Sequence, residues 1–247
     1  MNLTKRLTKH FQLLASYTWT KTLDDTDQAG SSATFGGWWS NDQRNERQAY
    51  GPSEFLRPQR LIISYLYTLP EPSKSMPAAH ALLGGWQLSG VTTFQSGNML
   101  TVYDGARSGS IYGWPQFTSG RAQLAPGVTS ADLVTAGTVT SKLNNYFNKA
   151  SFANPPVIGD GFDWGNSARG ITTGPDQRNF DIGLSKTTHL KGTPENSRLG
   201  FRAEFFNAFN TSQFANPVTD RSSATFARIT ATAVGPRVIQ FALKYNF

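Results

Sequence analysis

The 247-residue chain contains no cysteine, which excludes a disulfide framework and thiolate chemistry. It also lacks any run approaching the roughly 18 apolar residues that a membrane-spanning helix needs. His10, His80 and His189 lie far apart in the sequence and do not have the spacing of zinc ligands. A Gly-x-Ser-x-Gly sequence, a phosphate-binding loop and a dinucleotide fingerprint are missing as well. The sequence therefore predicts neither an enzyme nor a bound metal or cofactor.

Long runs of basic residues are also absent. The formal net charge is +7, but the lysines and arginines are scattered, so we expect no nucleic-acid partner. Residues 1–6 lack the apolar core of a signal peptide. This fits either a protein that is not exported or a sequence whose natural amino terminus lies further upstream.

Aromatic residues and turn formers are abundant instead. Aromatic residues make up 13% of the chain, which also holds 23 glycines and 13 prolines, a combination that favours an all-β protein with long loops. The last ten residues alternate, with Gln240 and Lys244 opposite an apolar face. A soluble edge strand could share this pattern, but an aromatic carboxy terminus is more typical of the closing strand of an outer-membrane β-barrel. The residues predicted to face lipid, and to engage the barrel-assembly machinery, are Ile239, Phe241, Leu243, Tyr245 and Phe247.

Five other segments alternate with a period of two, and the connections between them are alternately long and short. Antiparallel strands that cross an outer membrane should show this, because long loops lie outside the cell and short turns lie on the periplasmic side. Residues 2–7 are expected to be the end of an earlier strand. The predicted fold is all-β, an antiparallel up-and-down meander forming part of a transmembrane β-barrel, with about six long strands and long extracellular loops. The five segments are residues 11–20, 60–69, 86–96, 179–190 and 198–209.

Aromatic residues near both ends of the predicted strands are expected to form two girdles at the membrane interfaces. Trp19, Phe94 and Phe209 would lie at the outer ends. The inner ends would carry Phe11, Tyr67, Trp86 and Phe247.

Several motifs together resemble TonB-dependent receptors, in particular the Oar-like group with a carboxypeptidase-regulatory-like domain. The resemblance covers most of the chain outside residues 104–163. The motifs that carry it are Tyr17-Thr18-Trp19-Thr20-Lys21-Thr22-Leu23-Asp24-Asp25, Gly85-Trp86-Gln87-Leu88-Ser89-Gly90, Arg198-Leu199-Gly200-Phe201-Arg202-Ala203-Glu204-Phe205-Phe206-Asn207-Ala208-Phe209-Asn210 and Ser223-Ala224-Thr225-Phe226-Ala227-Arg228-Ile229.

The resemblance implies a barrel of about 22 strands with an amino-terminal plug in the bacterial outer membrane. Because the plug and the TonB box are absent here, we expect residues 1–247 to be a carboxy-terminal barrel fragment. In the full-length protein the barrel would capture a small ligand of the siderophore, glycan or peptide class. Uptake would then be driven by TonB acting through the plug.

Two sets of residues are candidates for ligand contact. Asp181, Arg202, Glu204 and Lys244 are expected to face the lumen, where they either line a substrate path or pair with one another across strands. Aromatic residues in the long loops either bind ligand or pack locally. This second set is Trp38, Trp39, Tyr112, Trp114 and Trp164. The carboxylates of Asp160 and Asp163 do not have EF-hand spacing, so no calcium site is predicted.

Two other functions remain open from the sequence. The chain could belong to a passive or structural outer-membrane barrel, or to a β-protein that binds glycans at the cell surface. A plug and a TonB box would distinguish active uptake from both.

Overall fold

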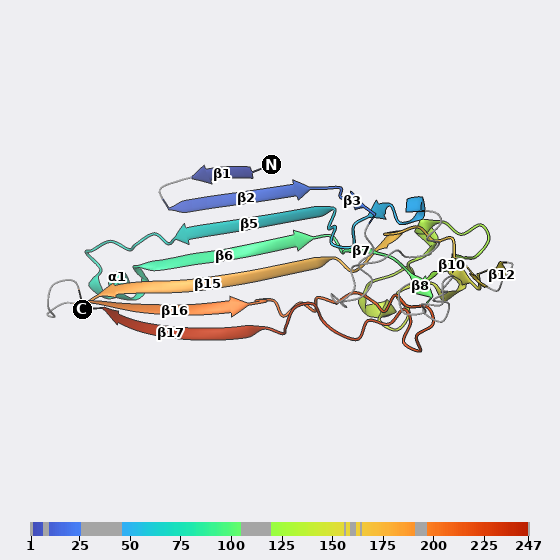
Figure 1. Cartoon of the computed structure of the whole chain (residues 1–247). Coiled ribbons are helices and arrows are strands. Elements are labelled where there is room, and N and C mark those ends of the chain that lie inside the picture. The colour runs from blue at the N-terminus through green and yellow to red at the C-terminus, as the bar shows by residue number, and fades with distance from the viewer. Residues whose placement is uncertain are drawn as a thin grey trace.

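A computed structural model describes residues 2–6, 10–25, 46–104, 120–155, 157–158, 162–163, 165–190 and 197–246. Its main element is one sheet of seven strands that pair antiparallel in sequence order (Figure 1). This confirms the predicted antiparallel meander. The strands are β1 (Asn2–Arg6), β2 (Phe11–Trp19), β5 (Gln59–Thr68), β6 (Trp86–Gln95), β15 (Gln177–His189), β16 (Arg198–Phe206) and β17 (Val238–Asn246).

The predicted strand boundaries differ from the structure by at most two residues, except at the end of β16, where the error is larger. β16 ends at Phe206 rather than at residue 209, because Asn207 adopts a left-handed backbone conformation with φ of 49°. Asparagine tolerates this conformation better than most residues. The Asn207 side chain fixes the turn by accepting a bond from the Thr211 amide at 3.0 Å and donating to the Gly235 carbonyl at 3.2 Å.

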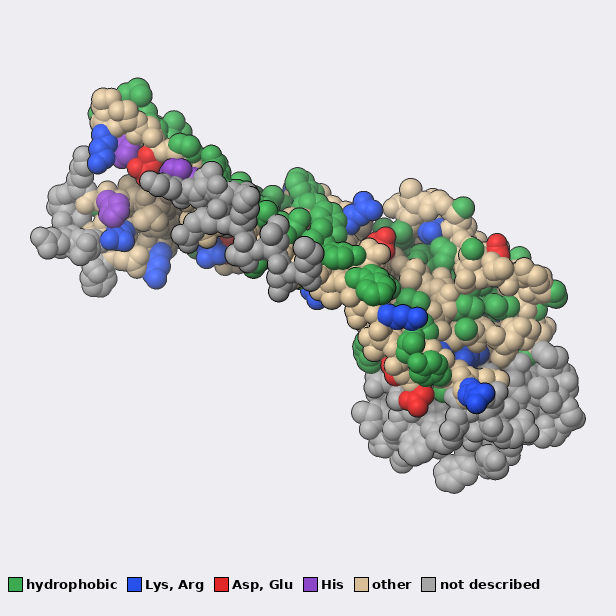
Figure 2. Space-filling model, turned by 90° about the horizontal axis from the view of Figure 1, so that it is seen from above, with side chains coloured by type: hydrophobic (Ala, Val, Ile, Leu, Met, Phe, Trp, Pro, Cys, Tyr) green, Lys and Arg blue, Asp and Glu red, His purple; other side chains and the backbone are tan. Residues whose placement is uncertain are grey.

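The sheet has one apolar and one polar face, because side chains alternate along every strand and the register aligns them across strands. Seen from above, hydrophobic side chains line one side of the sheet (Figure 2). The apolar face is formed by Phe11, Leu13, Tyr17, Leu61, Ile63, Tyr65, Tyr67, Trp86, Leu88, Phe94, Phe180, Ile182, Leu184, Leu199, Phe201, Phe205, Ile239, Phe241, Leu243 and Tyr245.

Aromatic pairs mark both ends of the apolar face. At one end the Phe180 ring lies 5.6 Å from Phe94 and 5.1 Å from Phe209. At the other end the ring centroids of Phe11 and Tyr67 are 6.1 Å apart, and those of Trp86 and Phe201 are 6.2 Å apart. All four pairs are edge-to-face, a favourable geometry for aromatic rings.

The two ends of the sheet differ in what they carry (Figure 1). At the turn end, the link between β5 and β6 contains the helix α1 (Pro77–Leu83), which was not predicted from the sequence. At the loop end lie the long connections, residues 20–58, 96–176 and 207–237, whose described parts we call the loop cap. Among the described residues, no helix is long and apolar enough to cross a membrane.

The loop cap holds the buried core of the molecule. Phe147 stacks on Phe226 at 5.7 Å, and Phe152 contacts Phe226 edge-to-face at 5.5 Å. Leu133 and Val102 are fully buried beside them. Residues far apart in the chain therefore form one compact unit, rather than separate loops.

Short ribbons and 3-10 turns build the rest of the loop cap. The strand pairs are β3 (Leu23–Asp24) with β4 (Gly51–Pro52), β7 (Met99–Leu100) with β14 (Thr172–Thr173), β8 (Tyr103–Asp104) with β9 (Gly120–Arg121), β10 (Gln123–Leu124) with β11 (Phe152–Ala153), and β12 (Val157–Ile158) with β13 (Phe162–Asp163). The 3-10 turns are η1 (Glu46–Gln48), η3 (Ser130–Asp132), η4 (Thr140–Lys142) and η5 (Lys149–Ser151).

Candidate ligand-binding site

The four charged residues that were predicted to face the lumen share the polar face of the sheet. Asp181 shares its face of β15 with Gly183, which is opposite Glu204 on β16. Lys244 on β17 is opposite Gly200, which shares its face of β16 with Arg202 and Glu204. Arg202 and Glu204 form an ion pair, with Nη2 and Oε1 2.6 Å apart. This pair lies along one strand, not across two strands. A half-exposed pair of this kind adds little stability but presents both charges on one surface.

Asp181 is engaged elsewhere, at the loop end. Its Oδ1 accepts a bond from the Asn207 amide at 2.9 Å, and its Oδ2 accepts one from Asn179 Nδ2 at 2.9 Å. Gln213 donates to Asn179 Oδ1 at 3.0 Å. Asp181 therefore ties β15 to the start of the last long connection.

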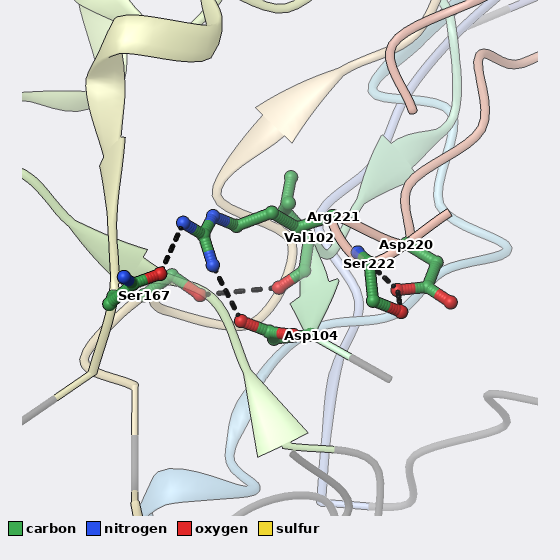
Figure 3. Close-up of polar contacts among 7 residues, drawn as sticks. Val102, Asp104, Ser167, Asp220, Arg221 and Ser222 are labelled. Atoms are coloured by element: carbon green, nitrogen blue, oxygen red, sulfur yellow. Dashed lines mark hydrogen bonds and ion pairs between the residues drawn. The ribbon is translucent and has the colours of Figure 1, made fainter. Parts of the chain in front are cut away.

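An ion pair between a partly exposed arginine and a buried aspartate joins two of the long connections inside the loop cap. Arg221 donates from Nη1 to Asp104 at 2.8 Å and from Nη2 to Asn154 at 2.8 Å (Figure 3). Asp104 is buried, and the Arg221 amide also donates to the Tyr103 carbonyl at 2.7 Å. Three separate segments thus meet at one guanidinium group.

A second arginine, which is buried, ties the first long connection to the middle one. Arg169 forms an ion pair with Asp24 and donates to the Asp24 carbonyl at 2.7 Å and the Ala49 carbonyl at 3.3 Å. The amide of its neighbour Gly170 donates to the Thr101 hydroxyl oxygen at 3.0 Å. The loop cap is therefore held together by polar contacts as well as by its apolar core.

A cavity of about 470 Å³ opens in the loop cap between three segments, residues 54–55, 98–103 and 216–219. Among its described lining residues, Glu54 is the only one with a charged side chain. The Tyr103 hydroxyl donates to Glu54 Oε1 at 2.6 Å, while Phe55 is 72% exposed at the rim. A carboxylate, amide groups and an open aromatic ring suit a neutral or cationic ligand better than an anion.

A smaller cavity of about 340 Å³ lies at the loop end of β2, β5, β6 and β15. Arg60, Arg178 and Asp176 line it together with Tyr17 and Phe94. Nearby, burial and then the charge of Arg60 lower the pKa of Arg57, whose guanidinium donates to the Ser96 carbonyl at 2.9 Å.

The lining residues of the larger cavity were not predicted from the sequence. Glu54 and Phe55 lie in a segment without periodicity, and Tyr103 becomes their neighbour only when two long connections fold together. The predicted loop aromatics Trp38, Trp39, Tyr112, Trp114 and Trp164 lie outside the described residues, as does Phe247. In the described part of the chain, no three His, Asp or Glu side chains are grouped closely enough to hold a metal ion.

Comparison with known proteins identifies the family. The model of the outer membrane beta barrel domain matches residues 1–240, which include all of β1 to β16 and the first residues of β17. No curated protein and no solved structure matches the chain. The matched domain places the protein in the bacterial outer membrane, and domains of this family are typically not enzymes. The chain belongs to the outer membrane beta barrel domain family.

Proposed function

We propose that this chain is the ligand-capturing barrel portion of an outer-membrane receptor, and that the full-length protein takes up its ligand with energy delivered by TonB through a plug. The proposal rests on the resemblance to TonB-dependent receptors and on the architecture of the loop cap. It includes no catalytic role.

The observation that carries the proposal is the cavity beside Glu54 and Phe55. A passive pore needs no packed unit over its outer end, whereas a receptor must hold a ligand there before transport. The loop cap supplies a preformed concave site of a size suited to a small ligand. Its single carboxylate favours neutral glycans and peptides with a free amino group over anionic ligands.

The two faces of the sheet fit the same proposal. The apolar face would meet membrane lipid, and the polar face, with Asp181, Arg202, Glu204 and Lys244, would line the lumen. β17 is an edge strand, and among the described residues it pairs only with β16. We expect the barrel-assembly machinery to bind its unpaired edge and its apolar residues.

Uptake by whole cells that produce the full-length receptor tests the proposal. Radiolabelled ferrioxamine, maltotriose and trialanine represent the three ligand classes. At least one should accumulate, and accumulation should stop when TonB is deleted or a protonophore is added. Glu54→Ala and Phe55→Ala should weaken capture, whereas Glu71→Ala, which removes an exposed carboxylate at the turn end, should not.

The remaining functions give different results in the same assay. Accumulation that persists without TonB would contradict active uptake and indicate a passive barrel. Binding of maltotriose at the cell surface without any accumulation would indicate a glycan-binding surface protein.

A further inference from the structure

The helix α1 at the turn end is not explained by packing within the chain. It has only seven residues, none of them buried, and no side chain caps its amino terminus. Helices this short are marginal in water without a packed face. The large apolar side chains of α1 and its N-cap are exposed: Met76, the N-cap, at 55%, Leu82 at 70% and Leu83 at 59%.

Two residues of the sheet hold the carboxy-terminal end of α1. Lys186 Nζ donates to the carbonyls of Ala81 at 2.7 Å and Leu82 at 2.6 Å. Trp86 Nε1 donates to the same Leu82 carbonyl at 2.9 Å. The lysine ammonium also lies 5.3 Å from the centre of the Trp86 ring, in reach of a cation–π contact.

These contacts place α1 on the apolar face. Lys186 is directly opposite Trp86 in the β15–β6 register, and Trp86 shares its face with Leu88. A lysine on a lipid-facing surface is costly unless its head group reaches polar partners at the membrane boundary. Here the carbonyls at the end of a helix provide those partners, where a cation is also favoured by the helix dipole.

We propose that α1 is an interfacial helix which inserts Met76, Leu82 and Leu83 into the membrane leaflet at the turn end, pinned there by Lys186 and Trp86. The occupant of this surface is phospholipid, because the exposed residues continue the apolar face that an outer-membrane barrel presents to the bilayer. This assignment does not depend on ligand capture or on TonB. It also explains why a charged residue, Lys186, occupies a position on the apolar face of the sheet.

Spin labels can measure the depth of α1 directly, since residues 1–247 contain no cysteine and any cysteine elsewhere in the full-length protein can be replaced by serine. Single cysteines at positions 82, 83, 74 and 243 are labelled with a nitroxide in the full-length protein, reconstituted in phosphatidylethanolamine–phosphatidylglycerol vesicles. Labels at 82 and 83 should collide more with oxygen, which enters the bilayer, than with a water-soluble nickel chelate. The label at 243, on the lipid-facing side of β17, should show the same preference. The label at 74, in the exposed segment before α1, should favour the nickel chelate. Equal nickel accessibility at 74, 82 and 83 would overturn the proposal.

Lys186→Met and Trp86→Phe test the pinning. Each should raise nickel accessibility at position 82 severalfold while the β-sheet circular dichroism stays unchanged. Lys142→Met is the matched control, because Lys142 also donates to a carbonyl, that of Thr135 at 2.8 Å, and lies 5.0 Å from the Tyr146 ring, but in the loop cap. If one pinning variant fails to fold, the other decides. Unchanged depth at position 82 in a folded variant would show that Lys186 and Trp86 do not position the helix.

Discussion

Tyr146 joins the core of the loop cap to the ribbon next to the sheet. Its ring packs against Phe147 at 5.3 Å, and its hydroxyl donates to the Thr173 carbonyl at 2.9 Å. Burial raises the pKa of Tyr146 from 10.0 to about 12, and the negative charge of Asp176 adds to the effect. The folded loop cap therefore favours the neutral phenol.

The raised pKa predicts a loss of stability in alkali. The contribution of Tyr146 is fully present below pH 10, where the unfolded chain also keeps the proton, and is lost as the pH rises toward 12. The loss should be on the order of 2 kcal/mol. Limited proteolysis of the loop cap between pH 9 and 12 should show it, and Tyr146→Phe should flatten this pH dependence. Parallel loss of protection in both proteins would contradict the assignment to Tyr146.

Removing Arg221 should expose the cost of an unpaired buried charge. Arg221→Gln leaves the buried carboxylate of Asp104 without its cation, which we expect to destabilise the loop cap by about 3 kcal/mol. Adding Asp104→Asn should recover part of the loss, because the orphaned charge is removed. Denaturant titrations followed by proteolysis of the loop cap measure both effects.

Arg228→Gln is the matched control for the Arg221 variant. Arg228 is exposed and makes a 3.3 Å contact with Asn144, so its loss should change stability by no more than about 0.5 kcal/mol. Equal effects at positions 221 and 228 would show that the Asp104–Arg221 pair does not stabilise the loop cap.

The strands are the part of this fold that the sequence predicts best. Residues 11–19, 59–68 and 86–95 alternate strongly, so their faces follow from a local period that needs no knowledge of the partners. The end of β16 could not be predicted in this way, because it depends on a turn at Asn207 that is held by hydrogen bonds to residues as distant as Gly235. α1 was missed because a seven-residue helix, starting at Pro77 and ending before Gly84, has too few turns to show a helical period.

The loop cap illustrates why the candidate site was harder to predict than the strands. Phe147 and Phe226 stack although they lie far apart along the chain. Contacts of this kind leave no periodic signal in the sequence. The cavity likewise forms where Glu54, Tyr103 and Pro217 come together from three connections. Resemblance to a receptor family suggested ligand capture by loops, but not which residues line the site.

The terminal strand gives a test of which face meets lipid. Leu243 is on the apolar face opposite Phe201, while its neighbour Ala242 is on the polar face opposite Arg202. Leu243→Arg should cost about 2–4 kcal/mol of folding free energy in a bilayer if the residue lies near the midplane. Ala242→Arg, one residue away, should cost much less. Refolding of the full-length protein into vesicles at increasing urea measures both, and equal costs would argue against the assigned faces.

At the scale of the whole molecule, we predict that residues 1–247 alone do not make a working transporter. One edge of β1 and one edge of β17 have no partner strand among the described residues. Backbone groups left unpaired in hydrocarbon cost several kcal/mol each. Produced alone in a bacterial outer membrane, the chain should aggregate or be degraded.

Planar-bilayer recordings and uptake assays on the chain alone check this prediction. Neither a stable conductance nor energy-dependent uptake should appear. A stable monomeric pore would instead support a small passive barrel.

The number of strands in the sheet limits the ways in which a cylinder can be completed. Seven antiparallel neighbours leave β1 and β17 pointing the same way, each running from the loop end to the turn end. Rolling this sheet until its own edges met would therefore create one parallel seam. A ring in which every neighbour is antiparallel has an even count. These seven strands can therefore belong to such a ring only together with an odd number of further strands. The strands that flank β1 and β17 must both run from the turn end to the loop end.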